Sequence, residues 1–142
     1  MAEDSPPPVP GEWQRTQVPN TGPWTVGTVW LDRPSGRYAM LVEPRHCNAL
    51  GTMNGGALAT FLDGQVMAVS DRPGDGTDHT PTITLTVDYL APPFAGDWLI
   101  AKTRLVRTTR SMIVSDVIVS VGKRVVARSN AIYSNTQGKV QQ

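Results

Sequence analysis

One segment constrains this chain most: residues 55–70, GGALATFLDGQVMAVS, form an almost unbroken apolar run in which Asp63 is the only ionisable residue. A helix that is apolar nearly all round is normally enclosed by the rest of the protein, so we expect a central buried helix here. An acidic side chain in such a helix must be paired, protonated or facing a cavity. Asp63 is therefore the first candidate for chemistry. A structural Asp bonded to neighbouring backbone is the competing interpretation.

The residues at the start of this run predict how the helix begins. Asn54 precedes it, and an Asn side chain accepts hydrogen bonds from the N–H groups that a helix leaves unpaired at its first turn. Gly55 and Gly56 follow. A helix start presents free N–H groups and a positive dipole end, and glycines allow a ligand to approach the backbone closely. The alternative is that the glycines only permit tight packing of the helix on a sheet.

Segments on both sides of the run have the alternation and β-branched or aromatic content of half-buried strands. Two strands joined by a turn at 34–36 precede the helix, and four strands follow it. The expected strands are 24–31, 37–42, 82–90, 98–106, 112–121 and 124–134, with a tight turn at 122–123. An antiparallel sheet must bury one face, and one long apolar helix is available to cover it. The prediction is an α+β fold in which a curved antiparallel sheet wraps around a central helix.

Length and composition limit the remaining possibilities. The 142 residues suit one domain, expected at 24–136, with an extended proline-rich arm at 1–23 and a polar tail at 137–142. The net charge of +1 gives no reason to expect nucleic acid or an anionic membrane as a partner. One cysteine, and an N-terminus without the basic start and apolar stretch of a signal peptide, favour a cytoplasmic protein. Two histidines and one cysteine predict no metal site.

Two motifs resemble the hotdog-fold thioesterase superfamily, in particular its PaaI-like and 4-hydroxybenzoyl-CoA thioesterase-like branch. The first consists of Asn48, Gly51, the tripeptide 54–56 and Asp63, whose spacing matches the family's Asn or Gln, Gly, His-Gly-Gly and acid. The second, TITLTVDYLAPPFAGDWLIAKTRLVR, resembles the family's strand, Pro-containing turn, Gly-Asp and following strand. The resemblance covers residues 24–133 and implies the hotdog fold.

The resemblance also implies an activity, hydrolysis of an acyl-CoA or aroyl-CoA to the free acid and CoA. Donors aimed at the carbonyl oxygen are usually the largest catalytic contribution, and the Gly55 N–H is expected to be the main one, with Gly56 against the substrate. Asp63 would act as nucleophile or as general base. Asn48 could hold the water or the carbonyl, or only form a turn. Thr82 matches a hydroxyl that contacts the acid in some relatives, although Thr is also a common strand residue.

One position departs from the family pattern, because Asn54 stands where His is usual. An Asn can cap the helix and donate from its amide, but it cannot act as a general acid near neutral pH. A non-catalytic acyl-CoA-binding or regulatory protein is therefore an alternative. A hotdog hydratase or dehydratase is a weaker one, since neither His46 nor His79 lies in a matching motif. Cys47 beside His46 is not expected to be a nucleophile, because neighbouring side chains in an extended segment point to opposite faces.

Basic side chains crowd the segment after the second motif, at Lys102, Arg104, Arg107 and Arg110, and Arg128 follows on the last strand. We expect Arg104, Arg107, Arg110 and Arg128 to contact the phosphates of CoA, which Arg and Lys bind well. An ordinary solvated strand face is the alternative. CoA would enter only as part of the substrate, with no metal or redox cofactor. The resemblance implies a homodimer or homotetramer with its site at the dimer interface.

Overall fold

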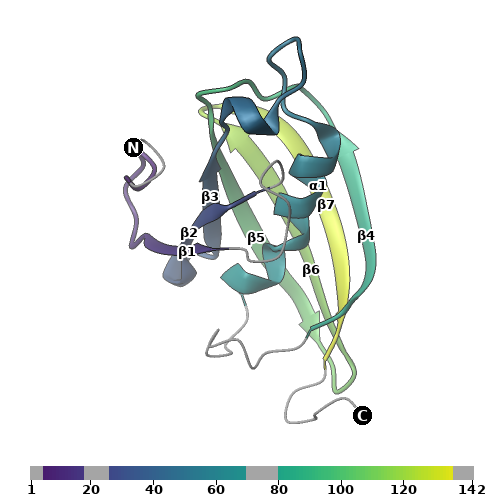
Figure 1. The fold of residues 1–142 in the computed structure, drawn as a ribbon. Coiled ribbons are helices and arrows are strands. Elements are labelled where there is room, and N and C mark those ends of the chain that lie inside the picture. Colours follow the sequence, from purple (N-terminus) through teal and green to yellow (C-terminus); the bar gives the residue numbers. More distant parts are fainter. Residues whose placement is uncertain (1–4, 18–25, 70–79, 136–142) are drawn as a thin grey trace.

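The computed structural model describes residues 5–17, 26–69 and 80–135 of the chain (Figure 1). A curved antiparallel sheet of seven strands, in the order β1-β2-β3-β5-β6-β7-β4, wraps around helix α1 (Gly55–Asp63). The predicted α+β hotdog arrangement is confirmed. The strands are β1 Gln14–Gln17, β2 Thr28–Asp32, β3 Arg37–Leu41, β4 Thr82–Tyr89, β5 Trp98–Thr108, β6 Met112–Val121 and β7 Arg124–Ser134.

Short turns connect the strands where the sequence predicted them. The turn between β2 and β3 is a 3-10 helix, η2 (Arg33–Ser35), followed by Gly36 with a φ of 71°. Gly122, between β6 and β7, has a φ of 58°. Glycine adopts this left-handed conformation without the steric cost that a Cβ imposes, so both turns depend on it. A second 3-10 helix, η3 (Pro44–His46), follows β3.

The core lies between helix α1 and the inner face of the sheet. Helix residues that are almost fully buried include Ala57, Leu58, Phe61 and Leu62. The Phe61 ring packs against Tyr38 of β3, with their centroids 4.6 Å apart. Burying side chains of this size stabilises the fold by roughly 1.5–3 kcal/mol each.

The central helix is shorter than the sequence predicted. Its α-helical part ends at Asp63, and after Gly64 the chain continues as a 3-10 helix, η4 (Gln65–Ala68). The expectation of one regular helix through the apolar run is therefore wrong beyond Asp63. The reason is that side chains from the sheet bond to the last carbonyls of the helix, as described below.

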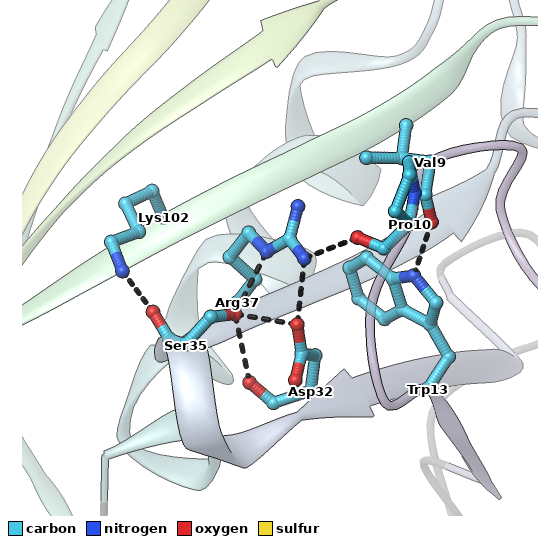
Figure 2. Close-up of polar contacts among 7 residues, drawn as sticks. All are labelled: Val9, Pro10, Trp13, Asp32, Ser35, Arg37 and Lys102. Atoms are coloured by element: carbon cyan, nitrogen blue, oxygen red, sulfur yellow. Dashed lines mark hydrogen bonds and ion pairs between the residues drawn. The ribbon is translucent and has the colours of Figure 1, made fainter.

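In the N-terminal arm, Gln14–Gln17 pair with β2 as an edge strand, which the sequence did not predict. Figure 2 shows how the arm is held. The Arg37 guanidinium donates hydrogen bonds of 2.7 Å to both the Asp32 carboxylate and the Pro10 carbonyl, and it lies 4.9 Å from the centre of the Trp13 ring. These contacts fasten the arm to the hairpin formed by β2 and β3.

Within the described residues, no helix has both the length and the apolar character that crossing a membrane requires. The predicted tail at 137–142 and the first residues of the predicted strand at 24–31 lie outside the described residues.

Candidate active site

Helix α1 begins as the sequence predicted. Asn54 is extended (φ −60°, ψ 132°), and its Oδ1 accepts hydrogen bonds from Gly56 N at 2.8 Å and Ala57 N at 3.4 Å. Among the described residues, the N–H of Gly55 has no hydrogen-bond partner, and the residue is exposed. The cap therefore satisfies two of the four N–H groups that a helix start leaves unpaired, and Gly55 keeps a free donor at the positive end of the helix.

Tyr89, at the end of β4, lies over this helix start. Its hydroxyl donates a hydrogen bond of 2.7 Å to the Gly55 carbonyl, and a Cβ placed on Gly55 would lie 3.4 Å from the Tyr89 side chain. The sequence interpretation missed this residue, because a Tyr at a strand end has no local signal for a contact with a helix.

The Asn48 side chain forms hydrogen bonds within the loop that precedes helix α1. Its Oδ1 accepts from Leu50 N at 2.9 Å and from Thr52 N at 3.2 Å, while its Nδ2 donates to Thr52 Oγ1 at 2.8 Å. The side chain is exposed, and these bonds make the turn that the sequence allowed as one interpretation. Its contact with a substrate stays a prediction.

Asp63, at the other end of α1, is half-buried and accepts a hydrogen bond of 2.8 Å from Thr82 Oγ1. The hydroxyl-to-acid contact expected at Thr82 is present because β4 contains a bulge. Thr82 pairs with Tyr133 and Thr84 pairs with Ile132, so Ile83 is an extra residue. In a regular strand Thr82 would share the outer face with Thr84. The bulge turns Thr82 inward, as bulges near functional sites often do.

A cavity of about 260 Å³ opens beside this carboxylate. Asp63 and Thr82 supply polar lining groups, and most of the remaining lining is apolar or aromatic: Val26, Val29, Phe61, Val66, Met67 and Tyr133. A mainly apolar cavity with a few converging polar groups is typical of small-molecule sites. The arrangement can hold an apolar group next to a carboxylate.

Gly55 and Asp63 lie at opposite ends of the same helix. They are eight residues apart, which is about 12 Å along the axis at the usual helical rise. Two helical turns place them near one face of the helix, but in one copy of the chain they cannot both touch one reacting carbonyl. A site that uses both needs two helices.

The basic residues lie on a different surface. Arg104 forms an ion pair of 2.5 Å with Asp116, and Arg128 forms one of 2.7 Å with Asp88. On β6 and β7, the residues before and after Asp116 and Arg128 are buried, so these pairs occupy the outer face of the sheet, where they line a groove of about 760 Å³. Arg107 is exposed near the end of β5 and Arg110 in the turn after it. Contact of these four residues with CoA stays a prediction.

His46 and Cys47 contact the backbone of their own segment and its neighbours. His46 is buried, with Nδ1 accepting from Glu43 N at 3.0 Å and Nε2 lying 3.1 Å from the Val26 carbonyl. Burial raises the pKa of the Cys47 thiol, a nearby Asp97 adds to the rise, and a backbone hydrogen bond partly offsets it. A raised pKa keeps a thiol in its unreactive form. In the described parts of the chain, no three His, Cys, Asp or Glu side chains gather as a metal site requires.

Comparisons with known proteins agree with this fold. Residues 50–128 match the model of the thioesterase superfamily, which is more than half of the chain. A Pseudomonas aeruginosa protein provisionally named an esterase is 31% identical over 98 residues, which cover 67% of this chain and 71% of that protein.

Solved structures show the same architecture. A protein from Ralstonia eutropha, named as a phenylacetic acid degradation-related thioesterase, has a TM-score of 0.64 at 23% identity, covering 87% of this chain and 84% of that one. A Streptococcus mutans protein solved with bound acetyl-CoA has a TM-score of 0.62 at 26% identity, covering 74% of this chain and 82% of that one. With its central helix, curved sheet and matching sequence, the chain belongs to the thioesterase superfamily.

Proposed function

We propose that this protein is an acyl-CoA thioesterase that hydrolyses an acyl- or aroyl-CoA to the free acid and CoA. The observation that carries the proposal is the free N–H of Gly55. The Asn54 side chain accepts hydrogen bonds from the N–H groups of Gly56 and Ala57. The N–H of Gly55 has no partner among the described residues and lies at an exposed helix start. Attack on a thioester builds negative charge on the carbonyl oxygen, and a fixed donor at that oxygen lowers the barrier.

Asp63 supplies the other half of the reaction in this proposal. As a general base, it takes a proton from water while the water oxygen attacks the carbonyl carbon, and the C–S bond then breaks to release the CoA thiolate. As a nucleophile, its oxygen attacks the same carbon and expels the thiolate, and water then hydrolyses the resulting anhydride. Thr82 holds Oδ1 in either case, which leaves Oδ2 available for the reaction. Neither route needs a metal or a redox cofactor.

The substrate would lie between two copies of the chain. Because Gly55 and Asp63 of one copy are too far apart to share a carbonyl, the Gly55 N–H of one protomer would meet the Asp63 carboxylate of the other. The cavity beside Asp63 is mainly apolar and suits the acyl group. The Streptococcus mutans relative was solved with acetyl-CoA, which supports a CoA ester as the ligand class. A homodimer or homotetramer in a reducing compartment remains the expectation.

A panel of acyl-CoA and aroyl-CoA esters, monitored for thiol release, tests the function. Thiol release that depends on Asp63 supports hydrolysis. Binding without turnover favours the non-catalytic acyl-CoA-binding alternative, and hydration of an enoyl-CoA without thiol release favours a hydratase. Either result contradicts the proposal.

Gly55 allows a sharper test of the oxyanion donor. Gly55→Pro removes the N–H and nothing else that a helix start needs, because proline is tolerated at the first helical position and Asn54 already has the extended ψ of 132° that a following proline requires. Gly55→Ala keeps the N–H and is the matched control. We expect a loss in kcat of about 100-fold or more for Gly55→Pro and a small change for Gly55→Ala. A Gly55→Pro variant that is as active as the wild type would exclude this donor.

A further inference from the structure

Asp63 is held by the sheet at two points, and only one involves its carboxylate. Thr82 Oγ1 donates to the carboxylate at 2.8 Å, and the Tyr133 hydroxyl donates to the main-chain carbonyl of the same residue at 2.6 Å. Thr82 and Tyr133 are direct partners across β4 and β7, and the bulge at Ile83 places Thr82 on the same inner face as Tyr133. One cross-strand pair therefore forms hydrogen bonds with both the side chain and the backbone of Asp63.

The helix changes its hydrogen-bond pattern at the carbonyl that accepts this bond. In a continuing α-helix, Met67 N–H would donate to Asp63 O. It instead donates to Gly64 O at 3.0 Å, as in a 3-10 helix. Tyr133 supplies the donor for Asp63 O, so the last turn of α1 is fixed to the sheet.

The two preceding carbonyls of α1 also accept bonds from side chains in the core. The Tyr38 hydroxyl donates to Phe61 O at 2.9 Å, and Gln65 Nε2 donates to Leu62 O at 2.9 Å and to Ser129 Oγ at 3.1 Å. These bonds explain why the helix ends here. They do not touch Asp63, which separates their role from that of Tyr133.

Tyr133 is suited to hold Asp63 and not to exchange protons. It is 1% exposed, and burial, assisted by the charge of Asp63, raises the pKa of its hydroxyl well above the usual range. The hydroxyl therefore remains a donor at any assay pH. Its ring lines the cavity beside Asp63.

We propose that Tyr133 is a positioning residue for Asp63: it fixes the backbone of the acid while Thr82 fixes the carboxylate. Together they hold the rotamer in which Asp63 faces the cavity. The kinetic consequence of this inference rests on the proposed thioesterase function, whereas its conformational consequence does not. Because a displacement of about 1 Å of a reacting group can cost about 100-fold in rate, losing one of two anchors should cost about tenfold.

The test compares Tyr133→Phe with Tyr38→Phe. Both remove a buried hydroxyl that bonds to the end of α1, but only Tyr133 bonds to Asp63. We expect a similar fall in Tm for both. Tyr133→Phe should lower kcat about tenfold with little change in KM, and Tyr38→Phe should keep kcat within about twofold. Tyr133→4-aminophenylalanine, which keeps a donor at the same place, should restore kcat, and it also serves as the second variant if Tyr133→Phe does not fold.

A double-mutant cycle and an NMR measurement complete the test. If Tyr133 and Thr82 both act through Asp63, the fold loss in kcat of the double variant, Tyr133→Phe with Thr82→Val, should be smaller than the product of the fold losses of the two single variants. Three-bond couplings to Asp63 Cγ should show one χ1 rotamer in the wild type and in Tyr38→Phe, and averaging in Tyr133→Phe. Unchanged kcat in Tyr133→Phe, an equal loss in Tyr38→Phe, no rescue by the donor variant or a fully multiplicative cycle overturns the inference. If the wild type releases no thiol, the proposed function fails, and the couplings alone decide on Tyr133.

Discussion

Gly55 and Asp63 occupy the two ends of one helix, about 12 Å apart along its axis. A site that uses both the proposed oxyanion donor and the proposed acid would therefore take them from different copies of the chain. This relationship makes two inactive variants complementary. Gly55→Pro lacks the donor, and Asp63→Asn lacks the acid, but a mixed dimer contains one site in which both wild-type groups meet.

We expect activity to return when these two variants are unfolded together and refolded as a mixture. Random pairing gives about half mixed dimers with one intact site each, so about a quarter of the wild-type rate should be recovered. The measurement is thiol release from an ester that the wild type hydrolyses. A mixture as inactive as its components would show that the two groups do not act in one shared site.

Asp63→Asn should lower kcat by at least about 100-fold, because a positioned acid, base or nucleophile contributes on this scale. The fold should survive, since the amide has the same shape and its oxygen can still accept from Thr82. Thermal unfolding monitored by circular dichroism gives the control for folding. A variant that retains most of the wild-type rate would remove Asp63 from the mechanism.

Asn54→Ala should lower the free energy of unfolding by about 1 kcal/mol, because it removes the acceptor for Gly56 N and Ala57 N. Asn54→Ser keeps a capping oxygen and should remain close to the wild type in urea unfolding. Asn54→His restores the usual family residue and should preserve or raise activity. A folded but inactive Asn54→His variant would indicate that the site is adapted to Asn.

Single Ala variants of Arg104, Arg107, Arg110 and Arg128 test CoA binding. If these side chains hold the phosphates, KM for a CoA ester should rise with little change in kcat, while a pantetheine ester without the nucleotide is unaffected. The effect should be clearest at Arg107 and Arg110, because Arg104 and Arg128 are already paired with aspartates on the outer face of the sheet. Variants that treat both esters alike would assign these charges to an ordinary solvated surface.

The Asp32–Arg37 pair should stabilise the fold in a pH-dependent way. Burial opposes ionisation of Asp32, but hydrogen bonds from Ser35, Arg37 and the Glu12 backbone, with the charge of Arg37, outweigh it and lower the pKa of the carboxyl. A folded pKa below the unfolded value stabilises the protein above the unfolded pKa of about 4, and this contribution is lost as pH falls through the folded pKa.

Asp32→Asn should therefore lower the free energy of unfolding by about 2 kcal/mol at pH 7, and the difference from the wild type should shrink below about pH 4. Urea unfolding across this pH range measures it. Asp88→Asn is the matched control, because its ion pair with Arg128 is exposed and should contribute less than about 1 kcal/mol. A pH-independent difference for Asp32→Asn would contradict the assignment.

The sequence by itself determined the elements that depend on local patterns. The apolar run predicted the central helix with Asp63 on it, and Asn54 predicted where that helix begins. The alternation of apolar and polar residues predicted the strands from β2 to β7, and the residues between them predicted the connecting turns. These features follow from the periods of helices and strands and from the chemistry of caps and turns, which neighbouring residues carry.

The tertiary structure alone decided which of these residues meet. The bulge at Ile83 turns Thr82 toward Asp63, and Tyr133 reaches the Asp63 carbonyl from a strand seventy residues away. The end of the α-helix and the pairing of Arg104 with Asp116 depend in the same way on register between distant segments. Register is set by how the whole sheet packs on the helix, and a shift of one residue moves a side chain to the other face.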